Sequence, residues 1–166
     1  MSTPSSFDQF LEGFRETIVG ATARLRDIAP EQSRKKVADD DWSQREILGH
    51  LVDSAANNHH RFVRAQFTDD LLFPGYEQDG WVSVQKYRDE SWPDLIQLWS
   101  SYNLHLHHVF SAIPETVLTK SRERHNLDEI AFELVPKNQP ATLEYLIRDY
   151  VVHLRHHLNQ IFAETS

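Results

Sequence analysis

Apolar residues recur every three or four positions along four long stretches of the chain, and this spacing predicts four amphipathic helices. The expected ranges are residues 7–28, 44–67, 92–113 and 143–164. In the third range the same pattern predicts an inward-facing stripe made of Leu95, Leu98, Tyr102, Leu106, Val109 and Ile113. Four helices of similar length predict an all-α protein folded as a four-helix bundle.

Helix-start signals precede each of these stretches. A serine followed three residues later by glutamate or glutamine is the pattern of a capping box, in which each residue satisfies a free backbone N–H of the other. The candidate pairs are Ser6 with Gln9 and Ser43 with Glu46, and the candidate single caps are Ser91 and Thr142. These residues support the expected helix starts.

Two long connections separate the predicted helices. Residues 68–90 carry Tyr76 and Trp81, and residues 114–140 include the apolar run 130–135. Connections of this length usually either carry function or are disordered, and the aromatic content of these two favours ordered loops. The run at 130–135 is a candidate for a short strand or hairpin between the third and fourth helices.

Composition narrows the class of protein. A chain of 166 residues with 40% hydrophobic and 25% charged residues is typical of one globular domain, expected here over residues 1–166. The formal net charge of −8 argues against nucleic acid or an anionic membrane as partner. The chain has no cysteine, so a metal site must use histidine, carboxylate or water. Neither a signal peptide nor a membrane-spanning run is recognisable, so we expect a cytoplasmic protein.

Three histidines stand out. His153 and His157 lie four residues apart in the fourth predicted helix, so both imidazoles stand on one face. That face also carries Tyr150 and Ile161, and an unpaired polar ring among apolar side chains is costly. His50 lies on or near the inward stripe of the second predicted helix. Three imidazoles could share one metal ion and leave a coordination position open, which is typical of catalytic rather than structural sites.

Other interpretations of the histidines remain open. The spacing of the pair alone does not distinguish metal ligands from two polar residues on a partly exposed helix. Buried histidines satisfied by hydrogen bonds are the competing account. His156 is displaced around the helix, so we expect it at the edge of the site or outside it. His59 and His60 point away from His50, so one ion cannot easily join all three.

Helix geometry also predicts how the two histidine helices are oriented. At 1.5 Å per residue, His50 lies ~10 Å from the start of its helix, and the midpoint of the His153/His157 pair lies ~13 Å from the end of its own. Antiparallel packing of the two helices therefore brings the three imidazoles nearly level. The long connections permit the crossover that this arrangement needs.

Several polar and aromatic residues could support such a site, by orienting the imidazoles or by forming the wall of a pocket. Those on the second and fourth predicted helices are Glu46, Asp53, Ser54, Asn57, Asp149 and Tyr150. In the 68–90 connection, Tyr76 and Trp81 can form a wall that offers a hydroxyl and an indole N–H. For Glu46 the capping box is the stronger alternative, and for the two loop aromatics packing over the end of the bundle is nearly as well supported.

Three segments together resemble the DinB/YfiT-like family of metal-dependent enzymes, over a span from Trp42 to Ile161. The first is Trp42-Ser43 followed by Glu46-Ile-Leu-Gly-His50-Leu-Val-Asp-Ser54. The second is Val152-His153-Leu-Arg-His-His157-Leu-Asn-Gln-Ile161. The third, similar to the YfiT branch in particular, is Arg61-Phe62 with Pro74-Gly-Tyr76-Glu-Gln-Asp79-Gly-Trp81.

The resemblance implies a four-helix bundle that holds one divalent metal ion, nickel or zinc, with His50, His153 and His157 as its three ligands. It implies a metal-dependent hydrolase, or an S-transferase that uses a low-molecular-weight thiol such as bacillithiol or mycothiol. A bundle that binds metal in a structural, sensory or stress-related role is the rival class. We further expect a homodimer and a small-molecule substrate, with a thiol as one candidate.

Overall fold

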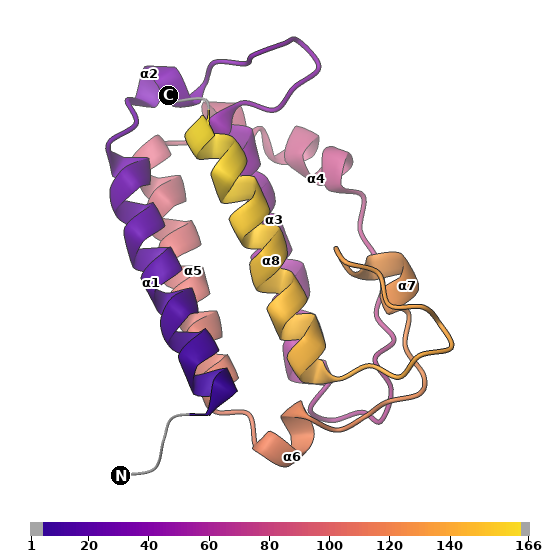
Figure 1. The fold of residues 1–166 in the computed structure, drawn as a ribbon. Coiled ribbons are helices and arrows are strands. Elements are labelled where there is room, and N and C mark those ends of the chain that lie inside the picture. Colours follow the sequence, from indigo (N-terminus) through magenta and orange to yellow (C-terminus); the bar gives the residue numbers. More distant parts are fainter. Residues whose placement is uncertain (1–4, 164–166) are drawn as a thin grey trace.

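The computed structural model describes residues 5–163, and four long helices form most of it (Figure 1). They are α1 (Ser6–Arg26), α3 (Gln44–Arg64), α5 (Trp92–Ser111) and α8 (Leu143–Ala163). These helices lie close to the ranges that the sequence predicts, and the all-α four-helix bundle is confirmed. The expected last residue of the fourth helix, Glu164, lies outside the described residues.

Side-chain caps fix where the helices begin. At α3, the Ser43 N–H donates to Glu46 Oε2 at 2.8 Å and the Glu46 N–H donates to Ser43 Oγ at 3.2 Å. The predicted capping box is therefore confirmed. The hydroxyls of Ser91 and Thr142 likewise accept the N–H three residues later, as the sequence predicts for α5 and α8.

The cap of α1 differs from the predicted one by a single position. The box is formed by Ser5 and Asp8 rather than by Ser6 and Gln9. The Asp8 carboxylate accepts the Ser5 N–H at 3.0 Å and the Ser5 hydroxyl at 2.9 Å. Its negative charge also suits the positive end of the helix. The neutral amide of Gln9 lacks this charge in the alternative register.

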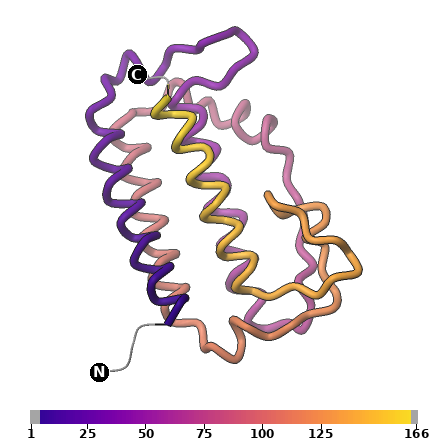
Figure 2. Tube along the Cα trace, viewed as in Figure 1, coloured from indigo at the N-terminus to yellow at the C-terminus, as the bar shows by residue number. Residues whose placement is uncertain are grey.

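The four helices do not simply alternate in direction. In Figure 1, α1 and α8 ascend while α3 and α5 descend, so α3 packs antiparallel to α8 and parallel to α5. α1 packs mainly against α5, and buried apolar side chains from all four helices form one core. The trace in Figure 2 shows the consequence. Residues 65–91 return along the outside of the bundle, so that α5 can begin beside the start of α3.

Short helices interrupt the connections. α2 (Pro30–Ser33) lies between α1 and α3. α4 (Gln78–Gln85) and the 3-10 helix η1 (Tyr87–Asp89) lie on the returning connection before α5. α6 (Glu115–Leu118) and α7 (Leu127–Ile130) lie between α5 and α8. Both long connections are thus ordered, as their aromatic content indicated.

The apolar run at 130–135 does not form the predicted strand or hairpin. Instead, the backbone N–H groups of Phe132 and Glu133 donate to the Asp149 carboxylate on α8. Within residues 5–163 the β-type pairings are the isolated bridges Leu71–His125 and Arg122–Ala141. A short apolar run does not determine its own structure, and here a buried carboxylate on another helix takes the N–H groups that a strand would have used.

The buried stripe of α5 is displaced around the helix from the predicted one. Leu98 is 46% exposed, whereas Trp99 is fully buried. Tyr102 and Val109 are half-buried at the edges of the interface. The buried positions are Trp92, Leu95, Ile96, Trp99, Asn103, Leu106 and Phe110. Because α5 packs against both α1 and α3, two neighbours set its inner face, and the large indole is the side chain that they enclose.

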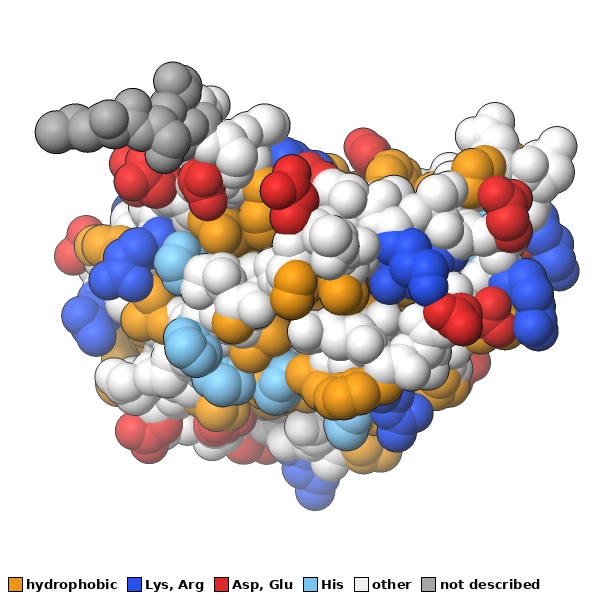
Figure 3. Space-filling model, turned by 90° about the horizontal axis from the view of Figure 1, so that it is seen from below, with side chains coloured by type: hydrophobic (Ala, Val, Ile, Leu, Met, Phe, Trp, Pro, Cys, Tyr) orange, Lys and Arg blue, Asp and Glu red, His pale blue; other side chains and the backbone are white. Residues whose placement is uncertain are grey.

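The described part of the chain shows neither a membrane-spanning helix nor a uniform charge on the end seen in Figure 3. Within the described part of the chain, no helix is both long and apolar enough to cross a membrane. On the end of the bundle seen in Figure 3, acidic and basic side chains are interspersed and apolar side chains occur in small groups. Among the side chains drawn by type on this face, no single charge dominates.

Gly49 marks a close approach between α3 and the returning connection. A β-carbon at this position would lie 2.2 Å from atoms of the Tyr87 ring on η1. Tyr87 is buried, and its hydroxyl donates to Asp53 Oδ1 at 2.7 Å, so the ring cannot move aside without losing this bond. The glycine that precedes His50 therefore has a packing role.

We predict that Gly49→Ala destabilises the protein by about 1–3 kcal/mol, the usual range for an overpacked core. Gly20→Ala on the exposed face of α1 is the matched control, because nothing lies within 4 Å of a β-carbon there. It should stabilise the helix by up to about 1 kcal/mol. Urea denaturation measures both variants, and equal effects would contradict the assigned contact.

Candidate metal centre

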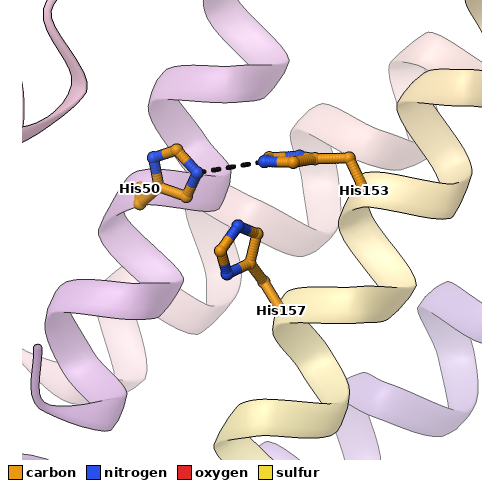
Figure 4. Close-up of side chains that lie close together, drawn as sticks. All are labelled: His50, His153 and His157. Atoms are coloured by element: carbon orange, nitrogen blue, oxygen red, sulfur yellow. Dashed lines mark hydrogen bonds between the residues drawn. The ribbon is translucent and has the colours of Figure 1, made fainter. Parts of the chain in front are cut away.

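The three predicted histidines come together from two helices (Figure 4). His50 lies in the second turn of α3, and His153 and His157 lie one turn apart on α8. Gln44 Nε2 donates to the Ile161 carbonyl at 2.8 Å, so the start of α3 is tied to the end of α8. The predicted antiparallel arrangement is thus confirmed. In Figure 4 the three rings point toward one another, with His50 level with His153 and His157 below them.

The rings approach closely enough to share an ion. His50 Nε2 and His153 Nε2 face each other at 3.2 Å. The His157 ring centroid lies 4.7 Å from that of His50 and 4.5 Å from that of His153. One nitrogen from each ring lies within 4.8 Å of the other two. Among residues 5–163, no other group of three histidines or carboxylates meets this closely.

Burial keeps these imidazoles neutral. Loss of hydration, and to a lesser degree the nearby His157, lower the pKa of His50 to about 4. Burial and the neighbouring histidines lower the pKa of His153 to about 3. Burial also lowers the pKa of His157, although its hydrogen bond with Gln160 opposes that effect. At neutral pH each ring therefore keeps a nitrogen lone pair, which a metal ligand requires.

Hydrogen bonding alone does not account for these rings. His50 Nδ1 is buried without a hydrogen-bond partner among the described residues, and the partner of its Nε2 is another imidazole nitrogen. Two nitrogens bound at ~2.0–2.1 Å to one tetrahedral ion stand about 3.4 Å apart. The Nε2 separation of 3.2 Å is close to that value. Three neutral imidazoles also suit zinc, nickel and other divalent transition ions, so the residues fit a bound metal ion.

Polar contacts orient two of the rings. Ser54 Oγ makes a long contact of 3.5 Å with His153 Nδ1, and Gln160 Oε1 lies 2.7 Å from His157 Nδ1. Contacts of this kind select the ring nitrogen that remains for a metal. Ser54 lies where the sequence suggested. Gln160 was missed, although its place three residues after His157 on one helix was a usable signal.

A cavity of about 340 Å³ opens beside His153 and His157. Its volume is within the usual range for small-molecule sites. Its walls also include Ser54, Asn58, Arg61, Tyr76, Phe132, Asp149, Tyr150 and His156. His156 is thus at the edge of the site, as expected. His50 does not line the cavity.

Asp149 shapes the cavity by holding the segment after α7. Its Oδ2 accepts the Phe132 N–H at 2.9 Å, and its Oδ1 accepts the Glu133 N–H at 2.7 Å. The Phe132 ring then packs 5.3 Å, centroid to centroid, from His153. Burial raises the pKa of Asp149, and the two N–H bonds oppose that rise. Asp149 was a candidate either for orienting a histidine or for forming a pocket wall, and it lines the cavity and orders the wall beside the histidines.

The aromatic residues expected at the pocket divide into two groups. Tyr76 lines the cavity, and burial raises its pKa to about 12, so the hydroxyl stays protonated at neutral pH. Tyr150 also lines it, and its hydroxyl donates to Asn103 Oδ1 at 2.6 Å. Trp81 is 38% exposed and does not line the cavity. Its ring packs edge-on against Tyr76 with centroids 5.2 Å apart, so it supports that wall from behind.

Glu46, Asp53 and Asn57 do not join the histidines. For Glu46 this agrees with the capping box that the sequence favoured, whereas Asp53 and Asn57 were candidates for the site. Glu46 is engaged in the α3 cap. Asp53 Oδ1 accepts the Tyr87 hydroxyl and the Gln85 amide, both at 2.7 Å. The Asn57 amide donates to the Asp53 carbonyl at 2.9 Å. These closer partners explain why none of the three bonds to the histidine group or lines the cavity.

Comparison with known proteins places this arrangement in a family. Among solved structures, the chain is similar to YfiT from Bacillus subtilis, described as a probable metal-dependent hydrolase with an unusual four-helix bundle topology. The sequences are 15% identical, and the TM-score is 0.77 over 99% of this chain and 90% of YfiT, which shows a shared fold. No curated protein matches the sequence. The model of the DinB superfamily matches residues 14–161, and the protein therefore belongs to that superfamily.

Proposed function

We propose that the protein is a divalent-metal-dependent enzyme in which His50, His153 and His157 hold one zinc or nickel ion. The observation that carries this proposal is the convergence of three neutral imidazoles, one buried and two half-buried, beside a cavity large enough for a small molecule. The described residues supply three ligands and no fourth, which favours a catalytic over a structural site. The fold shared with YfiT supports the same proposal.

Hydrolysis is the reaction that we favour. A divalent ion with an open position lowers the pKa of a bound water or thiol, and the two nucleophiles give hydrolysis or thiol transfer. The chain's own residues would bind and orient the substrate. Phe132 and Tyr150 offer aromatic surface, and the protonated Tyr76 hydroxyl can donate a hydrogen bond to a substrate oxygen.

The state of Asp149 favours a second candidate, the transfer of a low-molecular-weight thiol. Both Asp149 oxygens already accept backbone N–H groups, which leaves this carboxylate poorly placed to remove a proton from water. A coordinated thiol needs no separate base. Assays of both reactions therefore belong in one experiment.

That experiment begins with protein purified without chelating resin. Elemental analysis should find close to one zinc or nickel ion per chain. Esterase, amidase and thiol-transfer assays should then reveal an activity that is lost on chelation and recovered when the metal is returned. A protein that carries no divalent ion and takes none up on dialysis would overturn the proposal.

We predict that His50→Ala, His153→Ala and His157→Ala each reduce bound metal to well below one ion per chain. Each variant removes a third of the ligand set, and two imidazoles hold a divalent ion far less tightly than three. His59→Ala is the control, because His59 lies on α3 but outside the histidine group. Its Nδ1 is 3.2 Å from the Tyr102 hydroxyl. Stoichiometric metal in the His157→Ala protein would show that the ligand assignment is wrong.

The metal-free protein is predicted to lose stability as the pH falls. In the folded chain the pKa is about 4 for His50 and about 3 for His153. In the unfolded chain both titrate near about 6.5. Below that pH the unfolded chain binds more protons, so acid favours unfolding by up to about 1.4 kcal/mol per pH unit for each ring.

Urea melts of the chelated protein between about pH 8 and pH 4 measure this loss. The free energy of unfolding should decline below about pH 6.5. The His50→Gln variant has one titrating ring fewer. Its free energy of unfolding should therefore decline less steeply with falling pH, by up to about 1.4 kcal/mol per pH unit. Identical slopes for the two proteins would mean that His50 is not held neutral by the fold.

Substitutions at Tyr76 and Trp81 separate a pocket role from a packing role. Tyr76→Phe should keep its metal and stability but lose turnover, because only a hydroxyl in the cavity wall is removed. Trp81→Ala should cost about 1–2 kcal/mol, less than a fully buried tryptophan, because Trp81 is 38% exposed. Val84→Ala on the same helix is the control, since Val84 is 78% exposed. Unchanged turnover in Tyr76→Phe would remove Tyr76 from the proposed site.

A further inference from the structure

Three arginines are buried in the fold, and two of them have a structural role. Arg45, Arg61 and Arg122 are 4%, 6% and 2% exposed. Arg45 donates through all three nitrogens to acceptors on α2 and on the residues around η1. Arg122 donates through both terminal nitrogens to three backbone carbonyls. Each therefore ties connecting segments to one another or to the bundle.

The Arg61 guanidinium donates fewer hydrogen bonds than those of Arg45 and Arg122. Nη1 donates to Asn58 Oδ1 at 3.3 Å, and Nη2 donates to the Pro74 carbonyl at 3.1 Å. A guanidinium carries five N–H groups, so most of those on Arg61 have no partner among the described residues. No described carboxylate lies within ion-pair distance of it, and Asp149 acts on it only from farther away. Arg61 lines the cavity, so a ligand there could accept hydrogen bonds from these remaining N–H groups and pair the charge.

Arg61 faces the cavity that the histidines border. Ser54 and Arg61 lie two turns apart on one face of α3, ~10 Å along its axis. Helical side chains lean toward the N-terminus, and the bond from Arg61 to Asn58 shows that lean. The guanidinium therefore extends toward Ser54, whose hydroxyl lies 3.5 Å from His153 Nδ1.

We propose that the substrate carries a carboxylate and that Arg61 binds it, an inference that rests on the proposed metal-dependent function. The planar fork of a guanidinium matches the two oxygens of a carboxylate. The distance along α3 then requires several bonds between the carboxylate and the group that reacts at the histidines. Arg61 would thus determine specificity by binding the end of the substrate that does not react.

The charge of the cavity favours a carboxylate over a phosphate. Asp149 and Glu129 line the same cavity as Arg61. Their repulsion acts on any anion, and it is about twice as large for a dianion as for a monoanion at the same distance. A single arginine offsets this repulsion more readily for one negative charge than for two.

Paired probes test the proposal on the zinc-loaded protein. Mercaptohexanoate and mercaptohexanol have the same thiol and chain, and differ in the carboxylate. Calorimetry should find mercaptohexanoate bound at least about tenfold more tightly by the wild-type protein, the usual worth of a charge-assisted hydrogen-bond pair. Equal affinities in the wild-type protein would overturn the proposal, and so would a stronger competition by inorganic phosphate than by acetate.

Variants assign the preference to Arg61. Arg61→Gln should bring the two affinities within about twofold, while the matched variant Arg64→Gln, on the exposed side of the same helix, keeps the preference. Arg61→Lys keeps the positive charge but lacks the planar guanidinium. It should fold and should show an intermediate preference for mercaptohexanoate. If either Arg61 variant kept the full preference for mercaptohexanoate, Arg61 would have a structural role like Arg45 and Arg122 and would not bind the substrate.

A measurement on metal-free protein separates this proposal from the metal-dependent function. Hexanoate, which has no thiol, should perturb the NMR signals of cavity residues in the wild-type protein and not in Arg61→Gln, whereas hexanol should perturb them equally in both. If the metal assignment is wrong, this dependence on Arg61 survives. If the Arg61 assignment is wrong, it is absent, while zinc-loaded protein still binds both thiols.

Discussion

The antiparallel pairing of α3 with α8 is the constraint on which the rest of the site depends. The bond from Gln44 to the Ile161 carbonyl sets the register of the two helices. That register brings His50 close to both His153 and His157. With α3 and α5 both descending, the chain must return along the outside of the bundle before α5, and this return supplies Tyr76 to the cavity wall. The crossover connection and the site thus both follow from the directions in which α3, α5 and α8 run.

Burial of the imidazoles, complete for His50 and partial for His153 and His157, works against stability unless something compensates for it. Each ring loses hydration, and the lowered pKa values of His50 and His153 record that loss. His50 Nδ1 is buried without a hydrogen-bond partner among the described residues. A metal ion would convert the remaining lone pairs into bonds, so its binding would stabilise the folded chain as well as equip the site. The neutral rings are therefore best explained as a preorganised ligand set.

Periodicity and spacing predicted the framework because these signals are local. The apolar repeat located all four long helices, and the serine–glutamate pair at Ser43 located the start of α3. The spacing of His153 and His157 placed both rings on one face of α8 because helical geometry alone decides it. The phase of α5 was wrong at Leu98, since two packing partners rather than the repeat select the inner face.

The details of the site depend on contacts between segments far apart in the sequence, which no local pattern reveals. Phe132 reaches His153 because Asp149 takes the backbone N–H groups of its segment, and nothing in the run at 130–135 indicates that contact. Asp53 was expected beside a histidine and instead bonds to Tyr87, which follows a long loop. The partners of Arg61 lie partly on that same connection, so its incomplete pairing became visible only in the folded chain.

X-ray absorption at the edge of the bound metal distinguishes an open three-histidine centre from a closed one, because it reports the ligands of the ion itself. We expect three imidazole nitrogens at ~2.0–2.1 Å together with one or more exchangeable light-atom ligands. Addition of mercaptohexanol should replace such a ligand by sulfur at ~2.3 Å if the open position accepts a thiol. A closed shell of four protein ligands, unchanged by added thiol, would contradict an open, three-histidine centre.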